Sequence, residues 1–224
     1  MRICAIIPAY NERETIDKII QETKQYVDTV FVVDDGSTDD TAEMARENGA
    51  EVIRHDVNRG IGAAQQSGYN VAIRNGYDYI VQLDGDRQHN PEHIPEMLSV
   101  AQGCDMVIGS RFLNKSYRGY PFVRRIGISF FTLVVKLLVG VNITDVTSGY
   151  RVYKAESLRK LGQLSSRHWA VEQTLEAGKR GFNIKEISIE MPVRNMGKSQ
   201  FSLVRYALYP FRMIPIIIKV MLFR

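Results

Sequence analysis

The chain has 224 residues, of which 45% are hydrophobic and 24% charged, and its formal net charge is +4. This length and composition suit one sizeable domain, with room for a small appendage. The charge excess is too small to predict nucleic acid binding, and no repeat or low-complexity tract is present. Cys4 and Cys104 lie inside apolar runs, which excludes a disulfide framework and favours a reducing compartment. The apolar segment from Ile3 to Ala9 is too short for a signal peptide, so we expect a cytoplasmic protein.

Strand-like and helix-like segments alternate from residue 2 to about residue 109. Apolar runs predict strands at Arg2–Ile7, Thr29–Val33, Glu51–Arg54, Tyr79–Leu83 and Asp105–Ile108. Helical spacing and capping signals predict helices at Arg13–Tyr26, Thr38–Glu47, Gly60–Asn75 and Pro91–Gln102. The alternation predicts an α/β fold, a mainly parallel sheet with helices on both faces.

Polar loops follow three of these strands, over residues 8–12, 34–39 and 84–88. Ligands of such sheets bind at the carboxyl ends of the strands. We therefore expect the three loops to form one site.

In the third loop, Asp84 and Asp86 flank Gly85 directly after a buried strand. Two neighbouring carboxylates repel each other unless a cation lies between them, and Mg²⁺ binds one or two protein carboxylates together with substrate phosphates. A surface turn is the alternative, since Asp-Gly is a common turn pair.

The pattern changes after Ser110. Residues 120–141 form a strongly apolar segment that also carries Arg124, Arg125 and Lys136. Its uncharged part, 126–135, is shorter than the roughly 20 residues of a spanning helix. A basic amphipathic helix at the membrane interface and a core helix both remain open. The segment from Tyr206 to Phe223 is similar, so we expect a domain over 1–201 and a membrane-associated tail over 202–224.

Several motifs in this order resemble family 2 inverting glycosyltransferases of the GT-A (Rossmann-like) fold. They are Ile6–Glu12 (IIPAYNE), Val32–Asp39 (VVDDGSTD), Asn58–Ala64 (NRGIGAA) and Leu83–Pro91 (LDGDRQHNP). Three further motifs are similar to the dolichol-phosphate mannose synthase and polyprenyl-phosphate glycosyltransferase branch. They are Gly109–Phe112 (GSRF), Asp145–Arg151 (DVTSGYR) and Arg194–Ser199 (RNMGKS). The resemblance covers about residues 3 to 201.

The resemblance implies a donor site for a nucleotide sugar and a divalent cation, Mg²⁺ or Mn²⁺. Asp84, Asp86 and Gln88 would bind the cation, with Asp86 as a catalytic residue. The implied nucleotide-sugar site comprises Pro8, Tyr10, Glu12, Val32, Asp34, Asp84, Gly85, Asp86, Arg111, Arg194 and Lys198. In the family, a lysine commonly follows the serine that corresponds to Ser199, but this chain has Gln200 at that position. We expect Lys198 to take the place of that lysine.

For the acceptor, the candidates are Arg111, Arg125 and Ser129, which would hold a phosphate, and Arg125 is also a catalytic candidate. Arg125 opens the basic apolar helix, and Ser129 lies one turn later on the same face. Asp145 is a catalytic candidate that would orient groups or accept a proton, and a loop cap is its alternative role. Glu172 is a secondary candidate, with a solvated helix face as the alternative.

We therefore expect an enzyme that transfers a hexose or N-acetylhexosamine from GDP-mannose or a UDP-sugar to dolichyl or polyprenyl phosphate. It would act at the membrane surface, on the cytoplasmic face or from the cytoplasm, without nucleic acid. Two alternatives remain: a family 2 glycosyltransferase with another acceptor, and a non-catalytic nucleotide-sugar binding protein at the membrane.

Overall fold

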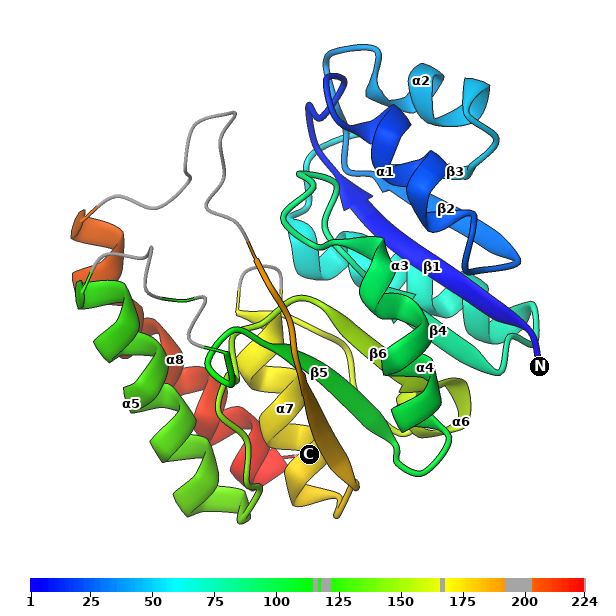
Figure 1. Ribbon diagram of the computed structural model, residues 1–224. Coiled ribbons are helices and arrows are strands. Elements are labelled where there is room, and N and C mark those ends of the chain that lie inside the picture. The colour runs from blue at the N-terminus through cyan, green and yellow to red at the C-terminus, as the bar shows by residue number, and fades with distance from the viewer. Residues whose placement is uncertain (115–116, 118–121, 166–167, 192–202, 224) are drawn as a thin grey trace.

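The computed structural model describes residues 1–114, 117, 122–165, 168–191 and 203–223, with only the backbone at Arg124 and over 203–212. Within these residues, seven strands form one sheet. They are β1 (Ile3–Ala9), β2 (Thr29–Asp34), β3 (Glu51–Arg54), β4 (Tyr79–Gln82), β5 (Met106–Ser110), β6 (Arg151–Lys154) and β7 (Ile184–Ser188). Their order is β3-β2-β1-β4-β6-β5-β7 (Figure 1).

Most neighbouring strands in this sheet are parallel. Strand β1 pairs in parallel with both β2 and β4, so that Ala9 faces Asp34 and Ile6 faces Gln82. Strand β6 is antiparallel to β4 and β5, and β7 is again parallel to β5. The mainly parallel sheet is confirmed, and β1 to β5 lie within two residues of their predicted bounds. The antiparallel β6 was not predicted.

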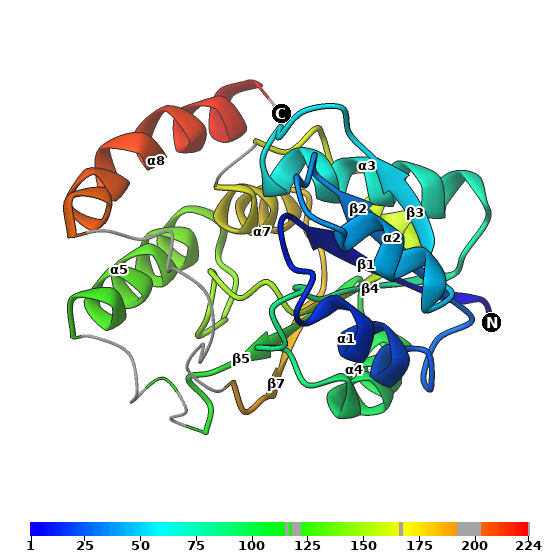
Figure 2. The ribbon, with the colours of Figure 1, turned by 90° about the horizontal axis from the view of Figure 1, so that it is seen from above.

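Helices cover both faces of the sheet (Figure 2). They are α1 (Ile16–Thr23), α2 (Thr41–Glu47), α3 (Ile61–Arg74), α4 (Ile94–Ala101), α5 (Phe122–Val139), α6 (Ala155–Leu158), α7 (Trp169–Lys179) and α8 (Leu203–Phe223), with a 3₁₀ turn, η1 (Pro91–His93), before α4. One buried cluster joins α1, α2 and α4 to the sheet, and a second joins α3, α5, α6, α7 and α8. The long parallel strands are therefore buried on both faces, as expected for such a sheet.

Helices α5, α7 and α8 form a layer of their own beside the sheet (Figure 1). Gly178 of α7 lies so close to α5 that a Cβ atom there would meet Val139 Cγ2 at 2.5 Å. The Nζ atom of Lys179 donates to the carbonyl oxygens of Val220 and Met221, at 3.1 and 2.9 Å, and so fixes the end of α8. The segment expected to be a membrane-associated tail thus shares a core with the preceding domain.

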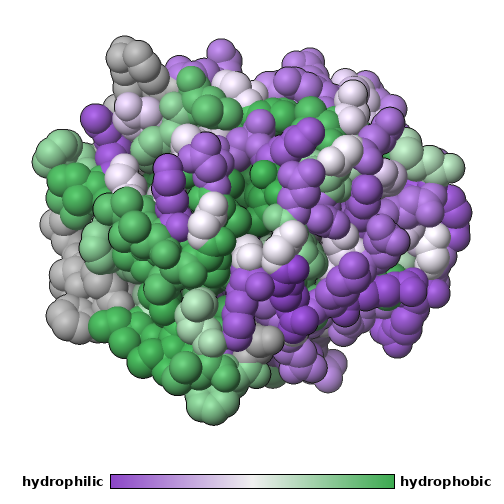
Figure 3. Space-filling model, turned by 90° about the horizontal axis from the view of Figure 1, so that it is seen from below, coloured by the Kyte–Doolittle hydropathy of each residue, from purple (hydrophilic) through white to green (hydrophobic). Residues whose placement is uncertain are grey.

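The outward sides of α5 and α8 carry exposed apolar side chains: Phe122, Val123, Ile126, Phe130, Leu133, Leu137 and Leu138 on α5, and Ile214, Ile218, Leu222 and Phe223 on α8. Figure 3 shows hydrophobic residues gathered on one side of the molecule and hydrophilic residues on the other. Helix α5 is therefore half core helix and half exposed apolar surface. In the part of the chain that the structure describes, no helix has the length and apolarity needed to cross a bilayer.

Candidate active site

Three loops meet at the carboxyl edge of β1, β2 and β4, as the sequence predicts. The hydroxyl of Thr15 donates to the carbonyl oxygen of Gly85 at 2.8 Å, which joins the first loop to the third. The backbone N–H of Asn11 donates to Ser37 Oγ at 2.9 Å, and Asn11 Oδ1 accepts the N–H of Thr38 at the same distance. The first loop is therefore joined to both of the others.

The carboxylate of Asp84 lies at the centre of this edge, with its side chain 30% exposed. Buried His89 lies beside it: the backbone N–H of Asp84 donates to His89 Nδ1 at 2.9 Å, and the imidazole stacks on Tyr150 at 5.0 Å. Burial lowers the pKa of His89 to about 4, against a smaller opposing effect of Asp86. The imidazole is therefore neutral at pH 7, and the 3.8 Å separation between its Nε2 atom and Asp84 Oδ2 is not an ion pair. His89 supports Asp84, a role that no motif in the sequence predicts.

Asp86 and Gln88 lie on the turn that follows. Asp86 Oδ1 accepts the backbone N–H of Gln88 at 3.1 Å. Between them Arg87 has a φ of 60°, in the left-handed region, and its Nη2 atom forms an ion pair with Glu22 at 2.9 Å. Left-handed residues other than glycine are uncommon and often mark ligand sites.

The expected cation set therefore consists of two carboxylates and one amide oxygen on a single loop. Oxygen ligands of this kind fit Mg²⁺ or Mn²⁺, with substrate phosphates completing the shell. The described residues contain no group of three His, Cys, Asp or Glu side chains that could hold a metal alone. A cation here would thus depend on the substrate for several of its ligands.

The expected nucleoside residues differ in their accessibility. Tyr10 is 39% exposed and Glu12 is half-buried, so both side chains reach the edge of the site. Pro8 is buried within β1, and Val32 is part of the hydrophobic core. Val32 therefore supports this site from beneath.

Asp34 is also buried, and its carboxylate already has partners. Its Oδ1 atom accepts the N–H of Ser37 at 3.1 Å. Its Oδ2 atom lies 3.1 Å from Arg54 Nε in an ion pair whose geometry is not that of a hydrogen bond. A nucleoside contact by Asp34 would compete with Arg54.

Gly85 is packed between the loops. A Cβ atom there would lie 3.5 Å from the carbonyl oxygen of Pro8 and 3.7 Å from Glu12 Cγ, which are ordinary contacts. The structure therefore gives no steric reason for a glycine at this position.

Asp35 is structural, although it belongs to the same motif as Asp34. Its carboxylate accepts the N–H groups of Arg59 and Gly60, at 3.0 and 2.7 Å, and lies 2.7 Å from His55 Nδ1. The other ring nitrogen of His55 lies 2.9 Å from Ser67 Oγ. These contacts hold the turn that begins α3.

Arg111 and Asp145 form a buried, bidentate ion pair. The Nε and Nη2 atoms of Arg111 lie 2.5 and 2.7 Å from the two oxygens of Asp145. Burial alone would raise the pKa of Asp145, but the charge and hydrogen bonds of Arg111 outweigh it and lower the pKa. Asp145 Oδ1 also accepts the hydroxyl of Thr147 at 3.0 Å, so the carboxylate is a loop cap as well. A carboxylate with a lowered pKa is a weak base, so Asp145 is better suited to orienting Arg111 than to accepting a proton.

Aromatic contacts connect Arg125 to the residue that follows Arg111. Its guanidinium lies 5.0 Å from the centre of the Tyr117 ring, which itself stacks on Phe112 at 4.3 Å. Phe112 directly follows Arg111, so the two candidate phosphate-binding arginines are linked through one stack. Ser129 is exposed on α5, one turn beyond Arg125. The two other candidates, Arg194 and Lys198, lie outside the described residues.

The interpretation of Glu172 as a solvated helix residue is wrong. Its side chain is fully buried on α7. It accepts the N–H of Ser165 at 2.6 Å and forms an ion pair with Lys219 of α8 at 3.5 Å. Glu172 therefore joins α7 to α8, and the sequence carried no signal for this because α8 is remote along the chain.

Comparisons with known proteins agree with this geometry. The family model described as glycosyl transferase family 2 matches residues 4–162. An undecaprenyl-phosphate mannosyltransferase of Micrococcus luteus is 33% identical, over 90% of this chain and 88% of that protein. A UDP-N-acetylglucosamine–dolichyl-phosphate N-acetylglucosaminyltransferase of Methanococcus voltae is 30% identical, over 84% of each chain.

Among solved structures, glucosyl-3-phosphoglycerate synthase from Mycobacterium tuberculosis, in complex with Mn²⁺, UDP and phosphoglyceric acid, superposes with a TM-score of 0.77. It is 20% identical, and the match covers 100% of this chain and 79% of that one, which shows a common fold. The family model spans well over half of the 224 residues, and with it the loops that carry Asp84 and Asp145. This chain therefore belongs to glycosyl transferase family 2.

Proposed function

We propose that this chain is an inverting, metal-dependent glycosyltransferase that uses a nucleotide sugar as donor and a polyprenyl (dolichyl) phosphate as acceptor. The sugar is a hexose or N-acetylhexosamine, carried by GDP or UDP. The observation that carries the proposal is the meeting of the three loops around Asp84, in a chain whose relatives are named for transfer to undecaprenyl and dolichyl phosphates.

On the donor side, Tyr10 and Glu12 are the accessible residues for the nucleoside. A carboxylate suits this task because ribose hydroxyls and base N–H groups are donors. Asp84, Asp86 and Gln88 would hold Mg²⁺ or Mn²⁺, which as a Lewis acid stabilises the departing diphosphate. Arg194 and Lys198 would bind the donor phosphates, as the family resemblance implies.

On the acceptor side, Arg111 and Arg125 would bind the phosphate. A phosphate oxygen attacks the anomeric carbon, the bond from that carbon to the diphosphate oxygen breaks, and the configuration inverts. Because a phosphate monoester is largely a dianion at pH 7, the nucleophile needs no strong base. The lowered pKa of Asp145 agrees with this, since its carboxylate holds Arg111 and has little affinity for a proton.

The exposed apolar sides of α5 and α8 support attachment to a membrane surface. Amphipathic helices bind the interface through buried apolar area and basic side chains, and the exposed Lys136 of α5 supplies such a charge. This surface lies on the same helix as Arg125, next to the proposed binding site of the acceptor phosphate. The free, buried Cys4 and Cys104 suit the cytoplasmic face.

A transfer assay tests this function. The purified chain is incubated with Mn²⁺, a short polyprenyl phosphate and labelled GDP-mannose, UDP-glucose or UDP-N-acetylglucosamine in turn. We expect one donor to label the organic-extractable lipid. If only a water-soluble acceptor became labelled, the assignment of polyprenyl phosphate as the acceptor would be wrong. If the chain bound the donor but transferred its sugar to no acceptor, the assignment as an enzyme would be wrong.

A further inference from the structure

The loop from Asp145 to Gly149, here called the 145–149 loop, lies directly against Asp84. A Cβ atom at Gly149 would lie 3.3 Å from Asp84 Oδ2 and 3.3 Å from His89 Cε1. Such distances are tighter than ordinary van der Waals contact, so one neighbour would have to move. Since His89 is buried and the Asp84 side chain is 30% exposed, the neighbour with more room to move is the carboxylate that the proposed function assigns to the metal.

Buried donors fix the carbonyl groups of this loop. Arg151 Nε donates to the oxygen of Ser148 at 2.8 Å, and its Nη2 atom donates to that of Val146 at 3.0 Å. The Nε2 atom of Gln82 donates to the oxygen of Gly149 at 2.8 Å. Three of the five loop carbonyls therefore have a side-chain donor from the sheet.

Arg151 is fully buried, and its hydrogen bonds go to neutral oxygens. Besides the loop it donates to the carbonyl oxygen of Ala170 at 3.1 Å and to Gln173 Oε1 at 3.3 Å, and it lies 5.1 Å from the ring centre of Trp169. A buried cation costs several kcal/mol, and a well-packed apolar residue of similar size is often as stable. Unlike an apolar residue, arginine can donate hydrogen bonds to several carbonyl oxygens at once.

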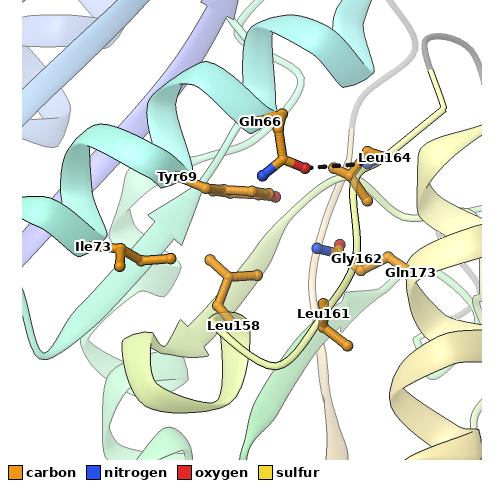
Figure 4. Close-up of a pocket in the computed structure, with 8 residues that line it drawn as sticks. All are labelled: Gln66, Tyr69, Ile73, Leu158, Leu161, Gly162, Leu164 and Gln173. Carbon is orange, nitrogen blue, oxygen red and sulfur yellow. Dashed lines mark hydrogen bonds between the residues drawn. The ribbon is translucent and has the colours of Figure 1, made fainter. Parts of the chain in front are cut away.

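The same network continues away from the site. Tyr153 donates to Gln173 Oε1 at 2.5 Å, and Tyr69 donates to Gln82. Figure 4 shows Tyr69 of α3 and Gln173 of α7 lining a cavity of about 10 Å³. That space holds about one water molecule, so the cavity is not a ligand site. The network is therefore a support that runs from α3 and α7 to the 145–149 loop.

We propose that Arg151 and Gly149 are positioning residues of the metal site. The Arg151 guanidinium fixes the 145–149 loop, and the absence of a side chain at residue 149 leaves the space in which Asp84 lies. This inference rests on the proposed function, because it takes Asp84 as a cation ligand.

The test uses Arg151→Lys, Arg151→Met and Gly149→Ala in the full chain. Mn²⁺ binding is measured by electron paramagnetic resonance with UDP or GDP present, together with thermal unfolding and the KM for the donor. We expect Mn²⁺ to bind roughly tenfold more weakly or worse in all three variants. Gly149→Ala should have the smallest loss of stability, because its effect is on Asp84.

Two controls separate positioning from general destabilisation. Ser157→Ala removes the 2.6 Å bond from Ser157 Oγ to Asp105, away from the site, and should lower the melting temperature while Mn²⁺ affinity stays unchanged. Gly103→Ala adds a Cβ atom whose nearest neighbour lies 3.7 Å away, and should change neither.

Wild-type Mn²⁺ affinity in folded Gly149→Ala, or in Arg151→Lys, would overturn the inference while leaving the metal site in place. If the wild-type chain bound Mn²⁺ no more tightly than the Asp86→Ala variant, the metal site itself would be overturned, and the inference with it.

Discussion

The proposed donor half and the proposed acceptor half of the site are held in different ways. In the donor half, the three loops after β1, β2 and β4 are joined by backbone and side-chain hydrogen bonds. In the acceptor half, the buried ion pair of Arg111 with Asp145 and a stack of Phe112, Tyr117 and Arg125 set the geometry. Beyond them lies an exposed apolar surface on α5.

This difference matches the two substrates that we propose. A nucleotide sugar is small, polar and fully dissolved, so a preorganised set of donors and acceptors can recognise it. A polyprenyl phosphate has one polar end, and its tail stays in the bilayer. The acceptor half therefore needs few fixed polar groups and an apolar surface beside them. Substitutions in the two halves should affect different quantities.

The largest effect is expected for Asp86→Ala in the donor half. Loss of one of the two proposed metal carboxylates should lower sugar transfer by about 10³-fold or more, which corresponds to about 4 kcal/mol of transition-state stabilisation. The melting temperature should change little, because Asp86 is partly exposed. Label in the extracted lipid gives the transfer rate.

The matched control is Asp56→Ala, which removes an exposed carboxylate between β3 and α3. It should keep wild-type transfer. Transfer by Asp86→Ala within tenfold of the wild-type rate would remove Asp86 from the metal site.

Next in size is Asp145→Asn in the acceptor half, whose main effect should be on stability. Breaking a buried ion pair leaves Arg111 uncompensated and typically costs about 3–5 kcal/mol. Because the folded pKa of Asp145 lies below the usual 3.8, the ionised carboxylate stabilises the fold fully above about pH 4 and progressively less below it. The gap in unfolding free energy between wild type and variant should therefore be widest above pH 4 and shrink at lower pH.

Glu186 provides the contrast for that measurement. It accepts the N–H groups of Thr144 and Asp145, at 2.7 and 2.9 Å, and burial raises its pKa. A raised pKa means that the ionised carboxylate of Glu186 is less favourable in the folded state than in the unfolded state, so Glu186 stabilises the fold less as the pH rises. The stability lost in Glu186→Gln should therefore be smallest at the higher pH values, which is the opposite of the trend for Asp145→Asn. A gap for Asp145→Asn that is constant from pH 7 to pH 3 would contradict the ion-pair account.

A smaller effect is expected for Leu133→Ser combined with Leu137→Ser on α5. These side chains are 54% and 76% exposed and lie one helical turn apart. Removing two leucines from the proposed membrane contact should weaken binding to anionic vesicles roughly 10- to 100-fold, or about 1.4–2.8 kcal/mol. Cosedimentation measures it. Val57→Ser, at a side chain 65% exposed in the donor half, is the control, and equal losses in both variants would contradict a specific membrane surface.

The donor half was also the easier one to predict from sequence. Its strands and helices are short, alternate regularly and are separated by polar loops, so local pattern places β1 to β5 within two residues. The convergence of the three loops then follows from the rule that parallel strands end at one edge.

The acceptor half depends on contacts between distant segments. Strand β6 inserts antiparallel between β4 and β5, and nothing in the four residues of Arg151–Lys154 encodes that pairing. The burial of Glu172 depends on α8, and the role of Arg151 depends on a loop and a helix that both fold around it. In the donor half, Val32 was assigned to the site through the family resemblance, although the continuous apolar run of its strand, which is buried on both faces, already indicates a core position.

The smallest effect is expected at Asn11, where the donor half is held by backbone conformation. Asn11 has a φ of 55°, and its Oδ1 atom accepts the N–H of Thr38. Asn11→Ala loses this bond and leaves in the left-handed region a residue that has a Cβ atom but not the local side-chain hydrogen bond by which asparagine tolerates it, at a cost of about 1–2 kcal/mol. Asn11→Gly loses only the bond. Thermal unfolding should therefore rank wild type above Asn11→Gly and Asn11→Ala last, with the donor KM rising a few-fold and the acceptor KM unchanged. Equal melting temperatures for the two variants would show that the hydrogen bond, and not the backbone conformation, fixes this loop.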